Sequence, residues 1–189
     1  MIENMNGAHT GIQDVMVDLE TYGTSAGCSI MSIGAVSFDR NGTGGESFYV
    51  VVDRNSCREV GLTEDHSTLA WWAKQSTEAK ETLVESTEGA TPIHDALKQF
   101  NEYLARRPAP TLWGNGSDFD NVILIAAYKA CGIEPAWKFY RNRCFRTLKA
   151  LFPTVGADVK REGVHHNAFD DAVYQAAIAS KIFAHIGKT

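Results

Sequence analysis

The sequence predicts an α/β protein, a single domain with a central mixed sheet of five strands flanked by helices. The first observation is the order of elements, because three segments with strand patterning come first and two further strands then alternate with helices. That order favours an antiparallel meander followed by parallel strands. The second is size and composition, since 189 residues with 44% hydrophobic residues suit one domain with its own core. The third is that the sequence holds no internal repeat or low-complexity linker.

The first strand is predicted over residues 14–20, with the sequence DVMVDLE. Side chains alternate between the two faces of a strand, so every second residue shares a face. One face carries Met16, Asp18 and Glu20. The other face is wholly apolar and carries Val15, Val17 and Leu19. We therefore expect both acidic side chains to point the same way from a strand whose other face enters the core.

The next two strands are predicted over residues 29–39 and 47–53, as an antiparallel hairpin around a glycine-rich turn at 41–45. Together with the first strand they complete the meander. After Asp53 the apolar residues take up helical spacing. Three helices are predicted here, over 67–75, 77–85 and 92–107.

The second half of the chain alternates strands with helices. Residues 110–114 predict a short buried strand, and residues 119–131 predict a helix after it. Another short strand is predicted over 139–146, leading into a helix that stops before Pro153. The last helix is predicted over 169–186, where apolar residues recur at the spacing of a stripe that faces the core.

The N-terminal segment, the apolar segments and the cysteines of the chain indicate where in the cell the protein is expected. Residues 1–12 are polar and show no signal or transit pattern, so we expect a flexible tail before one domain over 13–189. No segment approaches the ~18 apolar residues of a membrane span, which favours a cytoplasmic protein without a membrane partner. The four cysteines are widely spaced and include no Cys-x-x-Cys pair. We therefore expect reduced thiols, and neither a disulfide framework nor structural zinc.

The formal net charge of −5 argues against a protein that binds nucleic acid through overall attraction. The charge is unevenly distributed, however. Residues 138–149, KFYRNRCFRTLK, contain basic and aromatic residues and no acidic one. Such a segment suits a phosphate backbone with stacked bases, and it equally suits a strand and helix with a solvated basic face. The segment alone leaves both interpretations open.

The paired acids Asp18 and Glu20 indicate metal chemistry. Residues i and i+2 of a strand share a side, so the two carboxylates can serve one cation. Two-metal phosphodiester hydrolysis needs anionic oxygen ligands that hold two cations roughly 3.5–4 Å apart. The alternative is an exposed polar strand face, but burying two like charges is costly unless cations neutralise them. Two divalent cations would also bring the formal charge from −5 to about −1.

A second acidic element, NGSDFDNVIL, lies at a strand-to-helix junction, with Asp118 and Asp120 on either side of Phe119. Either acid can simply cap the helix, and for this segment alone the cap is the better interpretation. If Phe119 fills the core, Asp118 becomes the cap and Asp120 the metal ligand. This division is a prediction for the structure.

A third element, HHNAFDDAVYQA, places His166 before a helix and Asp171 in its first turns. The ordinary interpretation is a helix start with acids favoured by the helix dipole, which Asp170 fits, and a solvated histidine. A general base must titrate near neutral pH and reach the attacking water. His166 meets both needs if its loop folds over the metals.

Taken together, the segments VDLET, GNGSDFDNV and HNAFDD resemble the three motifs of the DEDDh exonucleases, in the DnaQ-like group of the ribonuclease H-like superfamily. The five motif positions are filled here by Asp18, Glu20, Asp120, His166 and Asp171. Asn167 stands where the tyrosine class would have tyrosine, which favours the histidine class. The segments SIGAVSFD and TLAWWAKQSTEAK are similar to a small phage and bacterial branch that includes a mycobacterial 3′-5′ exoribonuclease.

The resemblance implies a ribonuclease H-like fold, two divalent ions (Mg²⁺ or Mn²⁺) on the four acids, and His166 as general base. It implies hydrolysis of single-stranded nucleic acid from the 3′ end to nucleoside 5′-monophosphates. It also places Leu19 and Thr21 against the terminal nucleotide. Trp71 and Trp72 are adjacent on a predicted helix, so their side chains diverge by about 100°. We take Trp72 as a candidate for substrate contact.

Two other functions fit the same residues. One is an oligonucleotidase that accepts only very short substrates. The other is a catalytically silent scaffold of the same fold that binds nucleic acid. The filled motif positions speak against the scaffold. A homodimer is expected by resemblance alone, and the sequence does not decide between RNA and DNA, because that choice rests on contacts to the 2′-hydroxyl.

Overall fold

The computed structural model describes residues 12–86 and 89–187, so the predicted flexible tail lies almost wholly outside the described residues. Its centre is a mixed sheet with the strand order β3-β2-β1-β4-β5. The strands are β1 Asp14–Thr21, β2 Ile30–Asp39, β3 Gly42–Val51, β4 Thr111–Gly114 and β5 Asn142–Cys144. The first three pair antiparallel, and β4 and β5 run parallel to β1. The predicted meander followed by parallel strands is confirmed.

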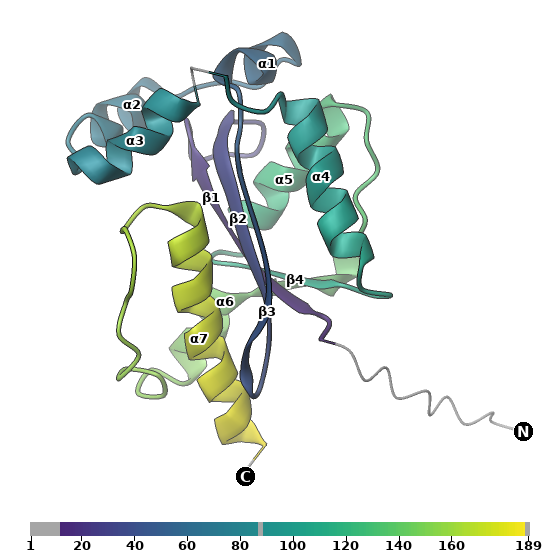
Figure 1. The fold of residues 1–189 in the computed structure, drawn as a ribbon, viewed down its shortest axis with the longest axis vertical. Coiled ribbons are helices and arrows are strands. Elements are labelled where there is room, and N and C mark those ends of the chain that lie inside the picture. Colours follow the sequence, from purple (N-terminus) through teal and green to yellow (C-terminus); the bar gives the residue numbers. More distant parts are fainter. Residues whose placement is uncertain (1–11, 87–88, 188–189) are drawn as a thin grey trace, which may run out of the picture.

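Helices cover both faces of this sheet (Figure 1). Their bounds are α1 Arg54–Glu59, α2 His66–Trp72, α3 Thr77–Glu85, α4 Ile93–Ala105, α5 Asp120–Ala130, α6 Phe145–Leu151 and α7 Ala168–Ile186. Apolar side chains of α4 and α5 pack in one core, while α6 and α7 contribute to a second core on the opposite face. None of the helices within the described ranges is both long enough and apolar enough to span a membrane.

Strand β1 is central in the sheet, and its two faces differ as the alternation predicts. Val15, Val17 and Leu19 lie in the core beneath α4 and α5. Met16 lies in the core beneath α7. Asp18 and Glu20 continue the Met16 face beyond that core, because side chains two residues apart share a side. The two acids therefore emerge where the apolar layer under α7 ends.

A close approach of α7 to strand β2 brings the start of that helix over the acids of β1. Gly34 of β2 is paired directly with Asp18. A Cβ atom added at Gly34 would lie 2.2 Å from backbone atoms of Ala168 and Phe169, which is far inside van der Waals contact. Only glycine allows the first turn of α7 to rest on the sheet here. Asp171, one turn into α7, is thereby placed above Asp18.

Three local predictions differ from the structure. The hairpin turn lies at residues 40–41 instead of 41–45, because the Asp39 side chain accepts a hydrogen bond from the backbone N–H of Asn41 at 2.7 Å and closes the turn early. Helix α1 was not predicted, since six residues are too few for a periodic signal. Its start is fixed locally, because Asp53 Oδ1 accepts a hydrogen bond from Ser56 N at 2.7 Å.

The predicted strand over 139–146 is shorter in the structure. Residues Phe139–Arg141 form a 3₁₀ turn, η1, and only Asn142–Cys144 pair with β4. The Arg141 guanidinium is held by Pro110 O and Thr111 Oγ1, and its backbone N–H donates to Lys138 O. These contacts bend the chain just before β5. They could not be predicted from residues 139–146 alone, because their partners lie about 30 residues earlier in the sequence.

Candidate active site

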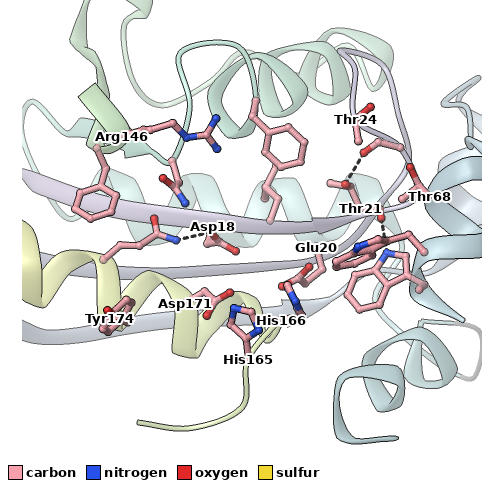
Figure 2. Close-up of a pocket in the computed structure, with 18 of the residues that line it drawn as sticks. Asp18, Glu20, Thr21, Thr24, Thr68, Arg146, His165, His166, Asp171 and Tyr174 are labelled. Carbon is pink, nitrogen blue, oxygen red and sulfur yellow. Dashed lines mark hydrogen bonds between the residues drawn. The ribbon is translucent and has the colours of Figure 1, made fainter. Parts of the chain in front are cut away.

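A cleft of about 750 Å³ opens at the end of β1 where the acids emerge (Figure 2). Its walls come from β1, α2, α6, α7, the segment before α5 and the loop between α6 and α7. It is lined by predicted site residues from distant parts of the sequence: Asp18, Leu19, Glu20, Thr21, Trp72, His166 and Asp171. The fold therefore assembles one site from these segments.

Three carboxylates meet at the floor of the cleft. Asp18 and Glu20 of β1 and Asp171 of α7 each offer an oxygen atom, and these atoms lie within 4.8 Å of one another. Their exposed fractions are only 9%, 7% and 8%. Three buried like charges at this separation repel one another strongly unless protons or cations neutralise them.

Asp120, the fourth predicted ligand, lies beside this group at the first position of α5 and is 1% exposed. Its Oδ1 accepts a hydrogen bond from Leu19 N at 3.2 Å, and its Oδ2 accepts one from Asn115 N at 2.6 Å. These bonds fix the carboxylate between β1 and the end of β4. Its negative charge reaches the acids of β1, because it raises the pKa of both Asp18 and Glu20.

The predicted division between Asp118 and Asp120 is wrong in its first half. Asp118 is exposed, and the N-cap position of α5 is Phe119, for which the structure gives no side-chain cap bond within the described residues. Phe119 is half-buried, packs against the core and lines the cleft, so it does separate the two acids. The Asp120 carboxylate is instead held by the backbone N–H groups of Leu19 and Asn115.

Burial raises the pKa values of these carboxyl groups. The pKa of Glu20 rises to about 8, because of burial first and the charge of Asp120 second. The pKa of Asp18 rises well above its usual range through burial and the charges of Asp120 and Glu20. Burial also raises the pKa of Asp120 to about 6, against the opposing effect of the N–H groups that it accepts. Without a cation, the site therefore holds protons near neutral pH.

The donor set fits a hard divalent cation. All four acids offer carboxylate oxygens, which Mg²⁺ and Mn²⁺ prefer, and among the described residues no cysteine lines the cleft. The geometry adds support, because three of these oxygens lie within 4.8 Å of one another and are almost buried. A bound cation would relieve the repulsion that otherwise keeps protons on these groups.

Metal should therefore stabilise the fold in a pH-dependent way. A carboxyl whose pKa is raised on folding, like Glu20 from 4.5 to about 8, binds more protons in the folded state, so stability falls as pH rises across that window. We expect the metal-free protein to melt at a lower temperature near pH 8 than near pH 5. A hundredfold excess of Mg²⁺ or Mn²⁺ over its Kd should stabilise it by about 2.7 kcal/mol, or roughly 5–10 °C.

Differential scanning fluorimetry with and without EDTA measures this shift. The matched control is Ca²⁺-free, Mg²⁺-free buffer with the same ionic strength. A melting temperature that does not change on addition of metal at either pH would contradict the assignment of these acids as ligands.

Two residues of the cleft were not found by the sequence analysis. Arg161, in the loop between α6 and α7, forms an ion pair with Asp171 and lies 4.3 Å over the Tyr174 ring. A single arginine in an irregular segment gives no spacing signal. Gln175 donates a hydrogen bond to Asp18 Oδ1 at 2.7 Å. Gln175 could have been predicted from the sequence, because it follows Asp171 by four residues and therefore lies on the same face of α7.

His166 lies in the loop that ends at the N-cap Asn167 of α7, and its backbone φ of 65° is rare for a residue with a side chain. Its ring lies 4.9 Å from the Trp71 ring and 3.9 Å from the His165 ring. Both histidines have a nitrogen within 4.8 Å of an Asp171 oxygen, and Figure 2 shows them together on the side of Glu20 and Asp171. Proximity to the acids therefore does not select one histidine.

The pKa of His166 is lowered by burial first, and then by the positive charges of His165 and Arg161. The imidazole is therefore neutral at neutral pH and able to accept a proton. The pKa of His165 is lowered in the same direction by burial and Arg161. Both side chains are in the protonation state that a general base needs.

The residues predicted to contact substrate all line the cleft, but they differ in accessibility. Leu19 and Thr21 are 3% and 5% exposed, and Thr21 Oγ1 donates to Gly23 O at 2.6 Å. Trp72 is only 1% exposed, and its Nε1 donates to Thr21 O at 3.0 Å. Trp71 is 43% exposed at the same cleft. The two tryptophans do diverge, and the structure favours Trp71 over Trp72 for contact with a ligand.

The chain matches a known protein family over most of its length. Residues 13–183 match a family model described as the 3′-5′ exoribonuclease Rv2179c-like domain. An exodeoxyribonuclease of Enterobacteria phage T4 is 29% identical over 123 residues, a match that covers 59% of this chain and 54% of that one. The chain thus matches about half the length of this curated relative.

Solved structures share the fold at low sequence identity. The nuclease domain of 3′hExo, a DEDDh family member bound to rAMP, has a TM-score of 0.61 at 12% identity, with 91% of this chain and 92% of that one covered. The RNase domain of yeast Pop2 has a TM-score of 0.61 at 7% identity, covering 92% and 76%. Exonuclease X in complex with 5′ overhanging duplex DNA has a TM-score of 0.53 at 15% identity, covering 93% and 94%. The predicted ribonuclease H-like fold is confirmed.

Proposed function

Because this chain belongs to the Rv2179c-like 3′-5′ exoribonuclease domain family, we propose that it is a metal-dependent exonuclease that shortens nucleic acid strands from the 3′ end. One observation carries the proposal: three buried carboxylates within 4.8 Å of one another share a cleft with a neutral histidine and an exposed tryptophan. Residues 13–189 would act as one exonuclease domain.

Asp18, Glu20, Asp120 and Asp171 are proposed as the ligands of two divalent cations, Mg²⁺ or Mn²⁺. When bound, such ions polarise a scissile phosphate and favour ionisation of the attacking water. Asp120 is held rigidly by its two backbone N–H bonds, and Gln175 orients Asp18. The ligands are therefore positioned before a substrate enters, which is the condition for efficient electrostatic catalysis.

His166 is proposed to take the proton from the attacking water. Its ring is partly buried and neutral, and it stands on the loop at the mouth of the cleft. The reaction would form a bond from the water oxygen to the last phosphorus and break the bond from that phosphorus to the O3′ of the preceding nucleotide. The products would then be a nucleoside 5′-monophosphate and a strand one residue shorter with a free 3′-hydroxyl.

The terminal nucleotide is proposed to rest against Leu19 and Thr21 of β1. Trp71, with its exposed ring beside His166, replaces Trp72 as the candidate for stacking on a base. Trp72 instead supports β1, because its indole N–H is bonded to Thr21 O. The homodimer expected by resemblance stays a prediction.

A labelled-strand assay tests the proposal. The purified chain, with Mg²⁺ or Mn²⁺, is given matched RNA and DNA, single- and double-stranded, labelled at the 5′ or the 3′ end. A 5′-labelled strand should shorten as a ladder, whereas a 3′-labelled strand should release labelled mononucleotide at once. Both sugars are needed, because the family description names RNA and the phage relative's name refers to DNA.

The same assay separates the alternatives. Hydrolysis of a dinucleotide without hydrolysis of a long strand would indicate an oligonucleotidase. Binding without turnover under Mn²⁺ would indicate the silent scaffold, and a ladder from only the 3′-labelled strand would show the opposite polarity.

A further inference from the structure

A strip of exposed basic and aromatic side chains runs along the β5 edge of the sheet, outside the catalytic residues. Its members are Lys138, Phe139, Tyr140, Arg143, Arg146 and Lys149, and each is exposed. Phe139 and Tyr140 are 77% and 65% exposed, an unusual state for adjacent aromatic rings. Their centroids lie 5.5 Å apart in a T-shaped arrangement.

The strip is continuous with the cleft. Arg143 of β5 pairs with Trp113 of β4, which pairs with Met16 of β1, so these three side chains share the face that carries Asp18 and Glu20. Helix α6 begins directly after β5, and its Arg146 and Lys149 line the cleft. Arg143 contacts the aromatic end of the strip, because its guanidinium donates a hydrogen bond to the backbone oxygen of Tyr140.

The basic side chains of the strip are not neutralised by ion pairs within the part of the chain that the structure describes. Residues 138–149 contain no acidic residue. Arg141 is used to hold the chain, through Pro110 O and Thr111 Oγ1, and it is half-buried. The other basic side chains of this segment form no ion pair within the described ranges of the chain. In a chain of formal charge −5, this edge is a locally positive surface, which attracts anions.

We propose that this strip binds the single-stranded part of the substrate that leads away from the 3′ end in the cleft. Arg146, Lys149 and Arg143 contact successive backbone phosphates, and bases farther from the end stack on Phe139 and Tyr140. Stacking on aromatic rings beside a basic groove is how single strands are bound without sequence preference. The inference rests on the proposed exonuclease function and adds a binding surface for strands longer than the cleft holds.

The test compares a dinucleotide with a strand of about 16 nucleotides, the upper end of common single-strand footprints. In the variant Phe139→Ala/Tyr140→Ala, kcat/KM for the long strand should fall at least about tenfold relative to kcat/KM for the dinucleotide, because stacking contributes about 1–3 kcal/mol per base. Most of the change should be in KM. In Arg143→Ala, the slope of log Kd against the logarithm of the salt concentration should decrease by about one, which is the contribution of one phosphate contact.

The controls lie elsewhere on the same fold. Phe139→Tyr/Tyr140→Phe keeps both rings and should behave as wild type. Tyr49→Ala lies on β3 at the opposite edge of the sheet, and Lys98→Ala lies on α4 across the sheet, so neither should change the ratio. An unchanged ratio in Phe139→Ala/Tyr140→Ala would overturn the proposal. So would a change of oligomeric state with unaltered strand binding, which would assign the strip to a protein interface.

Failure of this inference is distinguishable from failure of the exonuclease proposal. If wild-type protein hydrolyses neither the dinucleotide nor the long strand, the proposed function itself is wrong. If wild-type protein hydrolyses both and Phe139→Ala/Tyr140→Ala leaves the ratio of the two kcat/KM values unchanged, only the proposed binding surface is wrong.

Discussion

Asp171→Asn is expected to lower kcat at least about a thousandfold, because each 1.36 kcal/mol of lost transition-state stabilisation costs a factor of ten and a metal ligand supplies several kcal/mol. Asparagine keeps the size of aspartate and one acceptor oxygen, so Arg161 retains a partner. What disappears is one negative charge in a group of three carboxylates within 4.8 Å. The variant should therefore fold normally and fail in catalysis.

Asp120→Asn should lose activity to a similar extent and differ in stability. The Asp120 carboxylate accepts one backbone N–H on each oxygen, from Leu19 and Asn115. An asparagine amide would turn its NH₂ group toward one of these donors, so one hydrogen bond is lost and that N–H is left without an acceptor. We expect Asp120→Asn to melt below Asp171→Asn when both are measured without metal.

The measurements are kcat at saturating Mg²⁺ or Mn²⁺, with circular dichroism to establish folding. Asp118→Asn is the matched control, since Asp118 is exposed and two residues from Asp120. It should retain full activity. Activity within tenfold of wild type in either Asp171→Asn or Asp120→Asn would remove that residue from the set of ligands.

His166→Gln is expected to lower kcat by about a hundredfold to ten-thousandfold, the range that general acid–base catalysis contributes. Glutamine preserves a polar side chain but cannot accept a proton near neutral pH. Metal-dependent stabilisation should survive, because the four acids are untouched. The loss therefore falls on the chemical step and not on metal binding.

The role of His166 as a base also predicts the direction in which activity changes with pH. Burial lowers the pKa of His166 below 6.5, and a base must be neutral to act. Wild-type activity at saturating metal should be constant near neutral pH and fall on acidification, with its midpoint below 6.5. His166→Gln should lack that acidic limb.

His165→Gln is the decisive companion, because the His165 ring lies 3.9 Å from His166 and both histidines approach Asp171. We expect a much smaller loss of kcat and a retained acidic limb. The reverse result, with the limb lost in His165→Gln and kept in His166→Gln, would transfer the role of base to His165.

Several features of this protein were predictable because they depend only on short stretches of sequence. The two-residue alternation in DVMVDLE put Asp18 and Glu20 on one face of β1, and the structure shows them there. The helical stripe over 169–186 predicted α7 to within one residue. Element order then predicted a mixed sheet, since chain connectivity allows few other arrangements.

Other features were missed because they depend on contacts between distant segments. Strand β5 is shortened by bonds from Arg141 to residues 110 and 111. Asp118 was expected to cap α5, but Asp120 is held by Leu19 N, 101 residues earlier. No window of sequence contains both partners of such a bond.

By itself the sequence determined which residue types stand on one strand face, where the main helices run and which acids and histidines are present, because periodicity and capping act over a few residues. The tertiary structure alone decided which of these groups meet. It placed α7 on Gly34 so that Asp171 lies above Asp18, brought Arg161 and Gln175 to the acids, and left Trp71 exposed while burying Trp72. Those outcomes follow from close packing of segments far apart in the chain, which excludes some side chains from the cleft and admits others.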